Sequence, residues 1–424
     1  MDGHGRISIA DAAPPDGRPG ARAGYRLGSM DDGRVGVYLH VPFCERVCPY
    51  CDFAVVAARP LAPERERAYV DALLAELALR ARDFADPGGA ARPLASLYLG
   101  GGTPSLLAPA SVARLIDAVR AAFPSAGAVE TTLEVNPSTT ERARLPGFRD
   151  AGVNRLSIGV QSFDDDTLKR LGRAHRGEEA RATLAAARAA GFATLSLDLI
   201  VAAPGQRLAD LERDLDAALA FAPEHVSAYQ LTIEPGTPFE RAAARGKLAL
   251  ADEDEAVAML ERLVERLAAD GLERYEISSF ARPGHTARHN RRYWERQPVL
   301  GLGMGAWSSE PPAPAAPHGA RRANPRSLAA YLEGIAAGAP AAQVQERLDP
   351  ATARGEAAFL ALRTAGGLDA AAFAAEFGAA PRAFWPDAIA EAVAAGWLLE
   401  SARGDLRLSA AGVLLSDSLF ERFV

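Results

Sequence analysis

The sequence predicts an α/β protein, with a partial (β/α)6 TIM-like barrel followed by a mostly helical, winged-helix-like C-terminal domain. Short apolar, β-rich runs alternate six times with amphipathic segments between residues 35 and 231, the pattern of a parallel sheet with helical crossovers. Cysteine, glycine and polar motifs directly follow the first four runs. Barrels of this kind carry their chemistry at the carboxyl ends of the strands. From about Arg347 the pattern becomes mostly helical.

The six predicted strands are continuously apolar on at least one face, as buried parallel strands are. They span Val35–Val41, Leu97–Gly100, Thr131–Val135, Arg155–Val160, Thr194–Ile200 and His225–Leu231. The predicted crossover helices span Glu64–Arg82, Ala108–Ala122, Gly177–Ala190 and Leu208–Phe221. Right-handed crossovers around such strands produce a barrel or part of one.

The remaining patterns divide the chain into domains. We predict a disordered leader (1–33), the barrel (34–280), a connecting segment (281–340) and the C-terminal domain (341–424). The leader is rich in Gly, Pro, Arg and Asp without an apolar run. The barrel ends with a helix at Asp252–Ala269 and an apolar run at Glu276–Phe280. In the C-terminal domain we expect a hairpin at Trp397–Leu408 that turns at Gly404.

Composition and charge exclude several classes of function. The 424 residues carry a formal net charge of −7, so no general attraction to nucleic acid is expected. Winged helices often bind DNA, but residues 341–424 carry 7 Arg against 11 Asp and Glu, the wrong balance for phosphate contacts. No apolar run reaches the roughly 18 residues of a membrane span. The absence of a secretory signal and of an even cysteine set predicts a cytoplasmic protein.

All three cysteines lie in one stretch, HVPFCERVCPYCDF, from His40 to Phe53. Their spacing, C-x3-C-x2-C, allows several interpretations. A zinc site needs a fourth donor, for which His40 is the nearest candidate. A redox C-x-x-C pair explains Cys48 and Cys51 but leaves Cys44 without a role. Three thiolates in one loop also suit a cubane iron–sulfur cluster, in which the fourth iron stays open to an external ligand.

Polar residues at the other strand ends suit a small charged ligand. The glycines of Gly100–Pro104 allow the backbone to approach a ligand closely, although such a run also makes an ordinary tight turn. Glu134 offers a carboxylate and Gln161 an amide. Arg173 offers a guanidinium that pairs with carboxylates. Asp198 lies inside an apolar strand, where a carboxylate is unfavourable unless it is paired or functional.

The segment HNRRYW, His289–Trp294, is a second candidate. An imidazole is a common axial ligand of haem iron. Tyr293 follows His289 by four residues and shares its face if the segment is helical. The other interpretation is an ordinary polar loop.

Several motifs together carry a family resemblance. They are YLHVPFC, LYLGGGTPSLL, LEVNPS, NRLSIGVQSF, LGRAH, LDLI, PGQ, YQLTIEPGTPF, YEISSFA, HNRRYW and GLGMGA. With C-x3-C-x-aromatic-C after the first strand, they resemble the radical S-adenosylmethionine (SAM) superfamily. Within it they are most similar to the oxygen-independent coproporphyrinogen III oxidase group, and there to the HemW-type haem chaperones. The resemblance covers the chain from about Val35 to its end.

The resemblance implies a [4Fe–4S] cluster held by three cysteines, with SAM on the open iron. The cluster ligands would be Cys44, Cys48 and Cys51. The SAM-contacting positions would be Tyr38, Tyr50, Gly101, Gly102, Thr103, Glu134, Gln161, Arg173 and Asp198. The haem-binding candidates would be His289, Asn290 and Tyr293. Arg291 and Arg292 are candidates to pair with the haem propionates.

One departure separates two functions within the group. The porphyrinogen decarboxylase has a further cysteine two places after the third, and here that place is Phe53. The resemblance therefore favours a haem chaperone, with coproporphyrinogen III dehydrogenase of porphyrin biosynthesis as the alternative. A chaperone implies haem as cargo and a haem-requiring acceptor such as a membrane-bound respiratory enzyme. Peripheral contact with the inner membrane and a homodimer are compatible with this role.

Overall fold

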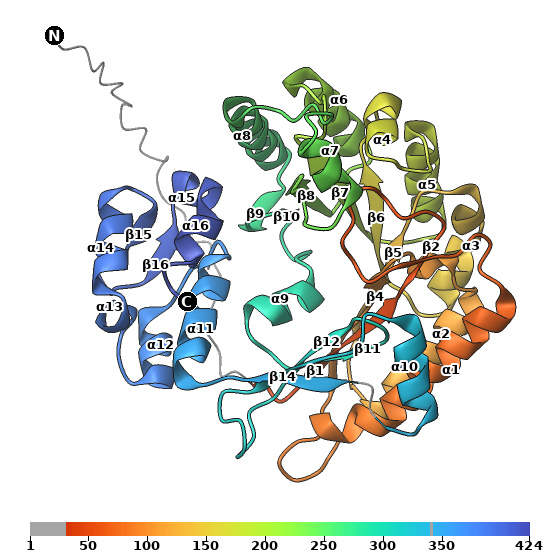
Figure 1. The fold of residues 1–424 in the computed structure, drawn as a ribbon, viewed down its shortest axis with the longest axis horizontal. Helices are drawn as coiled ribbons and strands as arrows, with labels where there is room; N and C mark the ends of the chain where they lie inside the picture. The colour runs from red at the N-terminus through yellow and green to blue at the C-terminus, as the bar shows by residue number, and fades with distance from the viewer. Residues whose placement is uncertain (1–30, 340–341) are drawn as a thin grey trace.

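The computed structural model describes residues 31–339 and 342–424, and one large sheet dominates it (Figure 1). Its six central strands are parallel and adjacent in chain order, which confirms the predicted barrel-type α/β fold. They are β1 (Val35–Val41), β4 (Leu94–Gly101), β5 (Glu130–Val135), β6 (Arg155–Gln161), β7 (Thr194–Val201) and β8 (His225–Gln230).

Helices cover the outer side of this sheet (Figure 1). They are α1 (Pro63–Arg80), α2 (Pro109–Ala122), α3 (Thr139–Asp150), α4 (Asp165–Arg170), α5 (Gly177–Ala189), α6 (Leu208–Leu219) and α8 (Glu253–Ala269), whereas α7 (Pro238–Ala243) packs against the cysteine loop, where the Phe239 amide donates to the Pro49 carbonyl. The four predicted crossover helices are present within two residues at each end. Helix α3 was not predicted because Pro146 lies inside it, but Ser138 caps it by accepting a hydrogen bond from the Glu141 amide.

The central strands alternate between apolar and polar side chains. Leu97, Leu99, Leu133, Leu156 and Leu197 are at most 1% exposed and belong to the main apolar core. The polar residues between them, which include Tyr98, Glu134, Ser157 and Asp198, line a cavity inside the barrel. Barrels usually fill their interior with branched apolar side chains. Here the strand period of two instead gives the interior a polar lining suited to a polar ligand.

Further strands extend the sheet at both ends. β10 (Ser279–Ala281) and β9 (Glu273–Glu276) are antiparallel additions beside β8. Beside β1 follow β11 (Val299–Leu302), β12 (Trp307–Glu310), β13 (Ala320–Ala323) and β14 (Gln343–Arg347). The sheet order begins at β14 and ends at β9, so the sheet does not close on itself. Figure 1 shows α9 (Arg288–Trp294) at the resulting gap.

The added strands do not follow the expected domain boundaries. Residues 281–340, expected as a connecting segment, contribute β11, β12 and β13 to the main sheet, and β14 lies beyond the expected boundary at 341. Strands such as ARRA and QVQER are short and polar. They therefore lack the apolar run by which a strand is predicted from sequence. α10 (Leu328–Ala336), which connects β13 to β14 along the chain, packs against α1.

The C-terminal unit has an apolar core of its own, which includes Leu362, Phe373 and Ile389. Its helices are α11 (Pro350–Leu362), α12 (Ala370–Phe377), α13 (Pro381–Phe384), α14 (Pro386–Ala394), α15 (Ala410–Leu414) and α16 (Ser416–Phe420). The predicted hairpin is present as β15 (Leu398–Glu400) and β16 (Leu406–Leu408). This order of helices and a hairpin matches the winged-helix-like expectation.

Residues 1–30 of the predicted leader (1–33) lie outside the described residues. Its last part does have defined contacts. The Asp31 carboxylate pairs with Arg92, and the Asp32 carboxylate accepts from Arg292 Nη1 at 3.0 Å. Arg292 is 5% exposed and also donates to the carbonyls of Arg34 and Pro298. Its expected role as a partner of haem propionates is therefore wrong in this structure, because the guanidinium is buried and already paired.

Candidate cluster and cofactor site

The three cysteines lie in the loop after β1, where β2 (Phe43–Cys44) pairs with β3 (Val56–Ala57). All three are free thiols and line the cavity inside the barrel, whose volume is about 420 Å³. In residues 31–339 and 342–424, no three Cys, His, Asp or Glu side chains converge on one metal ion. A cubane cluster does not require such convergence, because each thiolate binds a different iron.

Neighbouring groups prepare two of these sulfurs for metal binding. Thr103 Oγ1 donates to Cys44 Sγ at 3.7 Å, and Arg173 Nη1 donates to Cys48 Sγ at 3.5 Å. Donors to sulfur stabilise thiolates and tune iron–sulfur clusters. Burial raises the pKa of Cys44 to about 11, so at neutral pH this group is a thiol until a metal displaces its proton.

His40 does not supply a fourth metal ligand in this structure. Its Nε2 pairs with the Ala54 carbonyl at 2.8 Å, and its Nδ1 pairs with the Tyr38 hydroxyl at 3.0 Å. The ring is 5% exposed, and burial lowers its pKa. His40 therefore ties the end of β1 to the cysteine loop. The loop keeps three thiols without a fourth protein donor beside them, which disfavours the zinc interpretation.

The glycine run ends β4 directly beside this loop. Gly101 has a φ of +109°, and a Cβ there would lie 2.5 Å from the His40 ring. A Cβ on Gly102 would lie 2.8 Å from the backbone of Pro42 and Phe43. Both positions therefore need glycine, and the close packing brings the 101–103 backbone to the cavity wall beside the cysteines.

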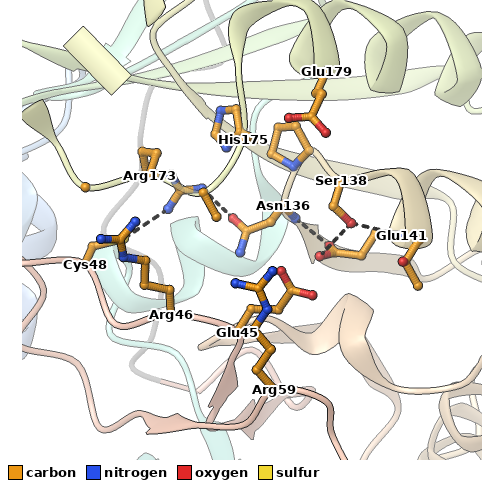
Figure 2. Close-up of a pocket in the computed structure, with 14 residues that line it drawn as sticks. Glu45, Arg46, Cys48, Arg59, Asn136, Ser138, Glu141, Arg173, His175 and Glu179 are labelled. Atoms are coloured by element: carbon orange, nitrogen blue, oxygen red, sulfur yellow. Dashed lines mark hydrogen bonds between the residues drawn. The ribbon is translucent and has the colours of Figure 1, made fainter. Parts of the chain in front are cut away.

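Arg173 joins the cysteine loop to the ends of β5 and β6. Besides Cys48, its guanidinium donates to Asn136 Oδ1 at 2.6 Å and to the Gly159 carbonyl at 3.0 Å. Asn136 in turn donates from Nδ2 to Thr103 Oγ1 at 2.7 Å. Figure 2 shows Arg173 and Asn136 between Cys48 and Glu141, in a second pocket that these residues line. Gln161, at φ +64°, ends β6 and lines the inner cavity.

Asn136 was not among the predicted site residues, although it bridges Thr103 and Arg173. A signal existed in the sequence, because Asn136 and Pro137 directly follow a predicted strand, as the other candidates do. Tyr98, which also lines the cavity, was missed because aromatic residues are common in strands and its position carried no other mark.

Two carboxylates line the inner cavity. Glu134 accepts from the Tyr98 hydroxyl at 2.8 Å and from the Gly101 amide at 3.0 Å. Asp198 accepts from Ser157 Oγ at 3.1 and 3.2 Å. Burial raises the pKa of Glu134 to about 7 and that of Asp198 to about 6. A cationic amine or sulfonium would favour their charged forms, and ribose hydroxyls would find acceptors here.

Replacing Asp198 with asparagine is expected to stabilise the apoprotein at pH 8. Because the folded pKa is above the ordinary value of 3.8, stability falls as the pH rises from about 4 to about 6 and stays reduced above that. Removal of the charge should raise the free energy of unfolding at pH 8 by roughly 2–3 kcal/mol. The variant should therefore have a higher Tm than wild type at pH 8, and the two Tm values should approach each other toward pH 4. SAM affinity should fall in the same variant. Asp216→Asn, at an exposed carboxylate, is the matched control. A lower Tm for Asp198→Asn at pH 8 would refute this account.

Comparison with known proteins now identifies the family. A model of the Radical SAM superfamily matches residues 38–218, and a model of the HemN C-terminal domain matches residues 348–415. The chain is 32% identical to Heme chaperone HemW of Bacillus subtilis over 391 residues, which cover 91% of this chain and 98% of that protein. The chain belongs to the HemW family. Heme chaperone HemW of Escherichia coli is 40% identical over 272 residues, 64% of this chain and 69% of that protein.

A solved structure confirms the fold. Coproporphyrinogen III oxidase (HemN) from Escherichia coli superimposes with a TM-score of 0.78 over 92% of this chain and 90% of its own, at 24% identity. At that identity the likeness establishes the fold alone. Membership of the HemW family, within the radical SAM superfamily, implies SAM and a [4Fe–4S] cluster. The three thiols, their two hydrogen-bond donors and the polar cavity beside them fit both groups.

The remaining predicted SAM positions lie around the same cavity. Tyr50 lines it, whereas Tyr38 lies behind Tyr98, with ring centroids 6.1 Å apart, and pairs with His40. Phe53, at the place of the decarboxylase's extra cysteine, is 64% exposed and lines the cavity mouth. It supplies no metal donor there.

Among the haem-binding candidates on α9, only Asn290 lines the cavity. His289 is 1% exposed, its Nδ1 pairs with Ser96 Oγ at 2.9 Å, and its Nε2 pairs with the Tyr293 hydroxyl at 3.2 Å. The helix thus places His289 and Tyr293 on one face, as their spacing predicts. Burial lowers the pKa of His289 to about 3, so the imidazole is neutral. Within the described residues, no helix is both long and apolar enough to cross a membrane.

Proposed function

We propose that this chain is a haem chaperone that binds a [4Fe–4S] cluster, SAM and haem, and delivers haem to haem-requiring proteins. The supporting observation is its identity to Heme chaperone HemW along 98% of the Bacillus subtilis protein. Phe53 adds support, because the fourth cysteine of the decarboxylase pattern is missing from the cavity mouth. The alternative, coproporphyrinogen III dehydrogenase, has only the shared fold with HemN in its favour.

In this proposal each part of the cavity wall has a role in holding the cofactors. Cys44, Cys48 and Cys51 hold the cluster, which when bound offers SAM an iron site and an electron. The 101–103 backbone lies where the amino acid end of SAM would approach the cysteine loop. Glu134 and Asp198 accept from its amine or ribose, and Tyr50, Gln161 and Arg173 complete the wall. Tyr38 supports this wall from behind through His40.

We place haem in the same cavity, entered past the apolar mouth and bounded at the floor by α9. Exposed apolar side chains surround the opening: Val47 is 43% exposed, Phe53 64% and Tyr229 45%. Such a rim suits the flat apolar face of a porphyrin. Asn290 reaches the cavity directly. Iron ligation by His289 would require its Nε2 to leave Tyr293, a rearrangement that haem binding would have to drive.

The deciding experiment compares haem binding with porphyrinogen turnover on anaerobically reconstituted protein. We expect a saturable haem titration in the presence of cluster and SAM, without consumption of coproporphyrinogen III. Transfer of bound haem to an apo-haem protein should then follow. Porphyrinogen consumption without a stable haem complex would favour the dehydrogenase instead.

Replacing His289 with alanine is expected to weaken haem binding while the absorbance of the cluster persists. The imidazole is neutral and therefore able to ligate iron once it is released from Tyr293. The test is a haem titration monitored by the Soret band. His285→Ala, at a half-buried histidine before α9, is the matched control. An unchanged titration would remove His289 from the haem site and leave it as a packing residue of the barrel floor.

The acceptor and location belong to the same proposal. A haem chaperone needs a haem-requiring partner, for which a membrane-bound respiratory enzyme is our candidate. We place the protein in the cytoplasm, with peripheral contact to the inner membrane at the acceptor. Size-exclusion chromatography of the reconstituted protein with and without haem would test whether it is a homodimer.

A further inference from the structure

Arg155 is a buried arginine to which the functions above assign no role. It begins β6 and points into the barrel, where it lines the floor of the inner cavity. The residue is 3% exposed, and its Nε has no hydrogen-bond partner. In residues 31–339 and 342–424, its guanidinium takes part in no hydrogen bond and in no ion pair within 4.0 Å. A buried, unpaired charge carries a desolvation penalty of several kcal/mol.

The other buried arginines of the described residues are all paired. Arg80 and Arg92 reach Glu310 and Asp31, Arg292 reaches Asp32, and Arg296 reaches Glu376. The fold therefore satisfies a buried guanidinium wherever the charge has only a structural role. Arg155 differs from these residues because it faces a cavity instead of a carboxylate.

The polar groups around Arg155 are engaged elsewhere. Asp198 accepts from Ser157, and it influences Arg155 only through space. His225 pairs with Ser196 and the Tyr275 hydroxyl, each at 2.8 Å. His289 pairs with Ser96 and Tyr293. Burial lowers the pKa of both histidines, and the charge of Arg155 adds to this effect at His225 and, after that of Arg292, at His289, so both rings stay neutral. The floor therefore carries a guanidinium that Asp198 influences electrostatically but with which no described residue forms a hydrogen bond or a contact ion pair.

Arg155 lies far from the end of the cavity beside the cysteine loop, where SAM is expected to bind. It is the first residue of β6, whereas Gln161 is the last, so their backbones lie roughly 20 Å apart along the strand. The guanidinium beside the cysteine loop is that of Arg173. An anion at Arg155 would thus come from the part of a ligand that reaches deepest into the barrel, next to α9.

We propose that Arg155 is an anion subsite at the barrel floor, which binds a carboxylate of the ligand that enters the cavity. Resting on the function proposed above, this carboxylate is a haem propionate, since haem carries two such groups on one edge. The ring would pass the apolar rim and lie inside the cavity, and the guanidinium would form a charge-assisted pair with the propionate that reaches the floor. The carboxylate of SAM is the other source of the same chemistry.

The test uses full-length protein reconstituted anaerobically, with Arg155→Met and Arg155→Lys beside wild type. Each is titrated with haem, with haem dimethyl ester, in which the propionates are uncharged, and with SAM. Arg155→Met should weaken haem binding roughly 10- to 100-fold, the usual loss for a charged hydrogen bond. The same variant should bind the ester and SAM with nearly wild-type affinity. The haem affinity of Arg155→Lys should lie between those of wild type and Arg155→Met. Arg114→Met, at an exposed arginine on α2, is the control.

Stability gives a second measurement. Removal of an unpaired buried charge should leave the Tm of the Arg155→Met apoprotein equal to that of wild type or higher. Equal losses for haem and its ester, or a variant that unfolds, would overturn the proposal in favour of a packing role. Loss of SAM affinity with haem binding intact would assign the subsite to SAM and overturn the propionate. Wild-type protein that binds no haem would instead contradict the proposed function, whereas Arg155→Met binding haem like wild type contradicts the subsite alone.

Discussion

Cys44→Ala protein is expected to assemble no [4Fe–4S] cluster and yet to retain the barrel fold. Three thiolates are the whole protein ligand set in the loop, and His40 is bound to Ala54 and Tyr38 and cannot substitute. The loop lies at the cavity mouth, and Cys44 is only half-buried, so its loss removes little core packing. Iron and sulfide analysis after anaerobic reconstitution should fall from about four of each per chain to the background level.

The fold of that variant is measured separately. Its apoprotein should have a circular dichroism spectrum and a Tm close to those of the wild-type apoprotein. Val47→Ala, in the same loop at a 43% exposed position, should assemble the cluster normally. Global unfolding of the Cys44→Ala apoprotein, or a full complement of iron in it, would show that the cysteine has a different role.

Arg296→Met is expected to destabilise the contact between the C-terminal unit and the barrel by about 3–5 kcal/mol, the usual effect of removing one partner of a buried ion pair. Arg296 follows α9 and has a side chain that is 2% exposed. Its guanidinium donates to Glu376 Oε1 at 2.8 Å and to Glu356 Oε1 at 3.3 Å. Both glutamates are half-buried and belong to the C-terminal unit, so the variant removes a partner from Glu376 and leaves Glu356 with its pair to Arg321.

Limited proteolysis is the measurement for Arg296, because a loosened C-terminal unit exposes the chain before α11 to cleavage. We expect faster release of a fragment that begins near Pro350, together with a lower Tm. Arg382→Met, whose partner Glu400 lies in an exposed pair within the same unit, should change the stability far less than Arg296→Met does. If the two variants behave alike, the Arg296 pairs do not hold the unit in place. α9 carries the haem-binding candidates. The haem affinity of the Arg296→Met variant therefore also shows whether the C-terminal unit positions α9.

The barrel and its cysteine loop were predictable because their signals are local. Leu97, Tyr98 and Leu99 alternate within one strand, and the cysteines are separated by three and two intervening residues. Parallel strands place their carboxyl ends at one edge of a sheet, so Gly101, Glu134 and Gln161 were expected together before any contact was known, whereas Arg173 follows α4 and was expected there only from the family resemblance. They do meet around one cavity, with Asp198 beside them.

The sequence by itself determined the alternation of parallel strands with helices and the residues offered to a cluster and SAM, since periodicity and spacing act over a few residues. Only the tertiary structure decided which partner each polar group takes. It bound His40 to Ala54, turned His289 inward toward Ser96, paired Arg292 with Asp32 and left Arg155 unpaired. The physical reason is that hydrogen bonds and ion pairs join atoms from distant parts of the chain. Their choice therefore depends on packing, which no local pattern encodes.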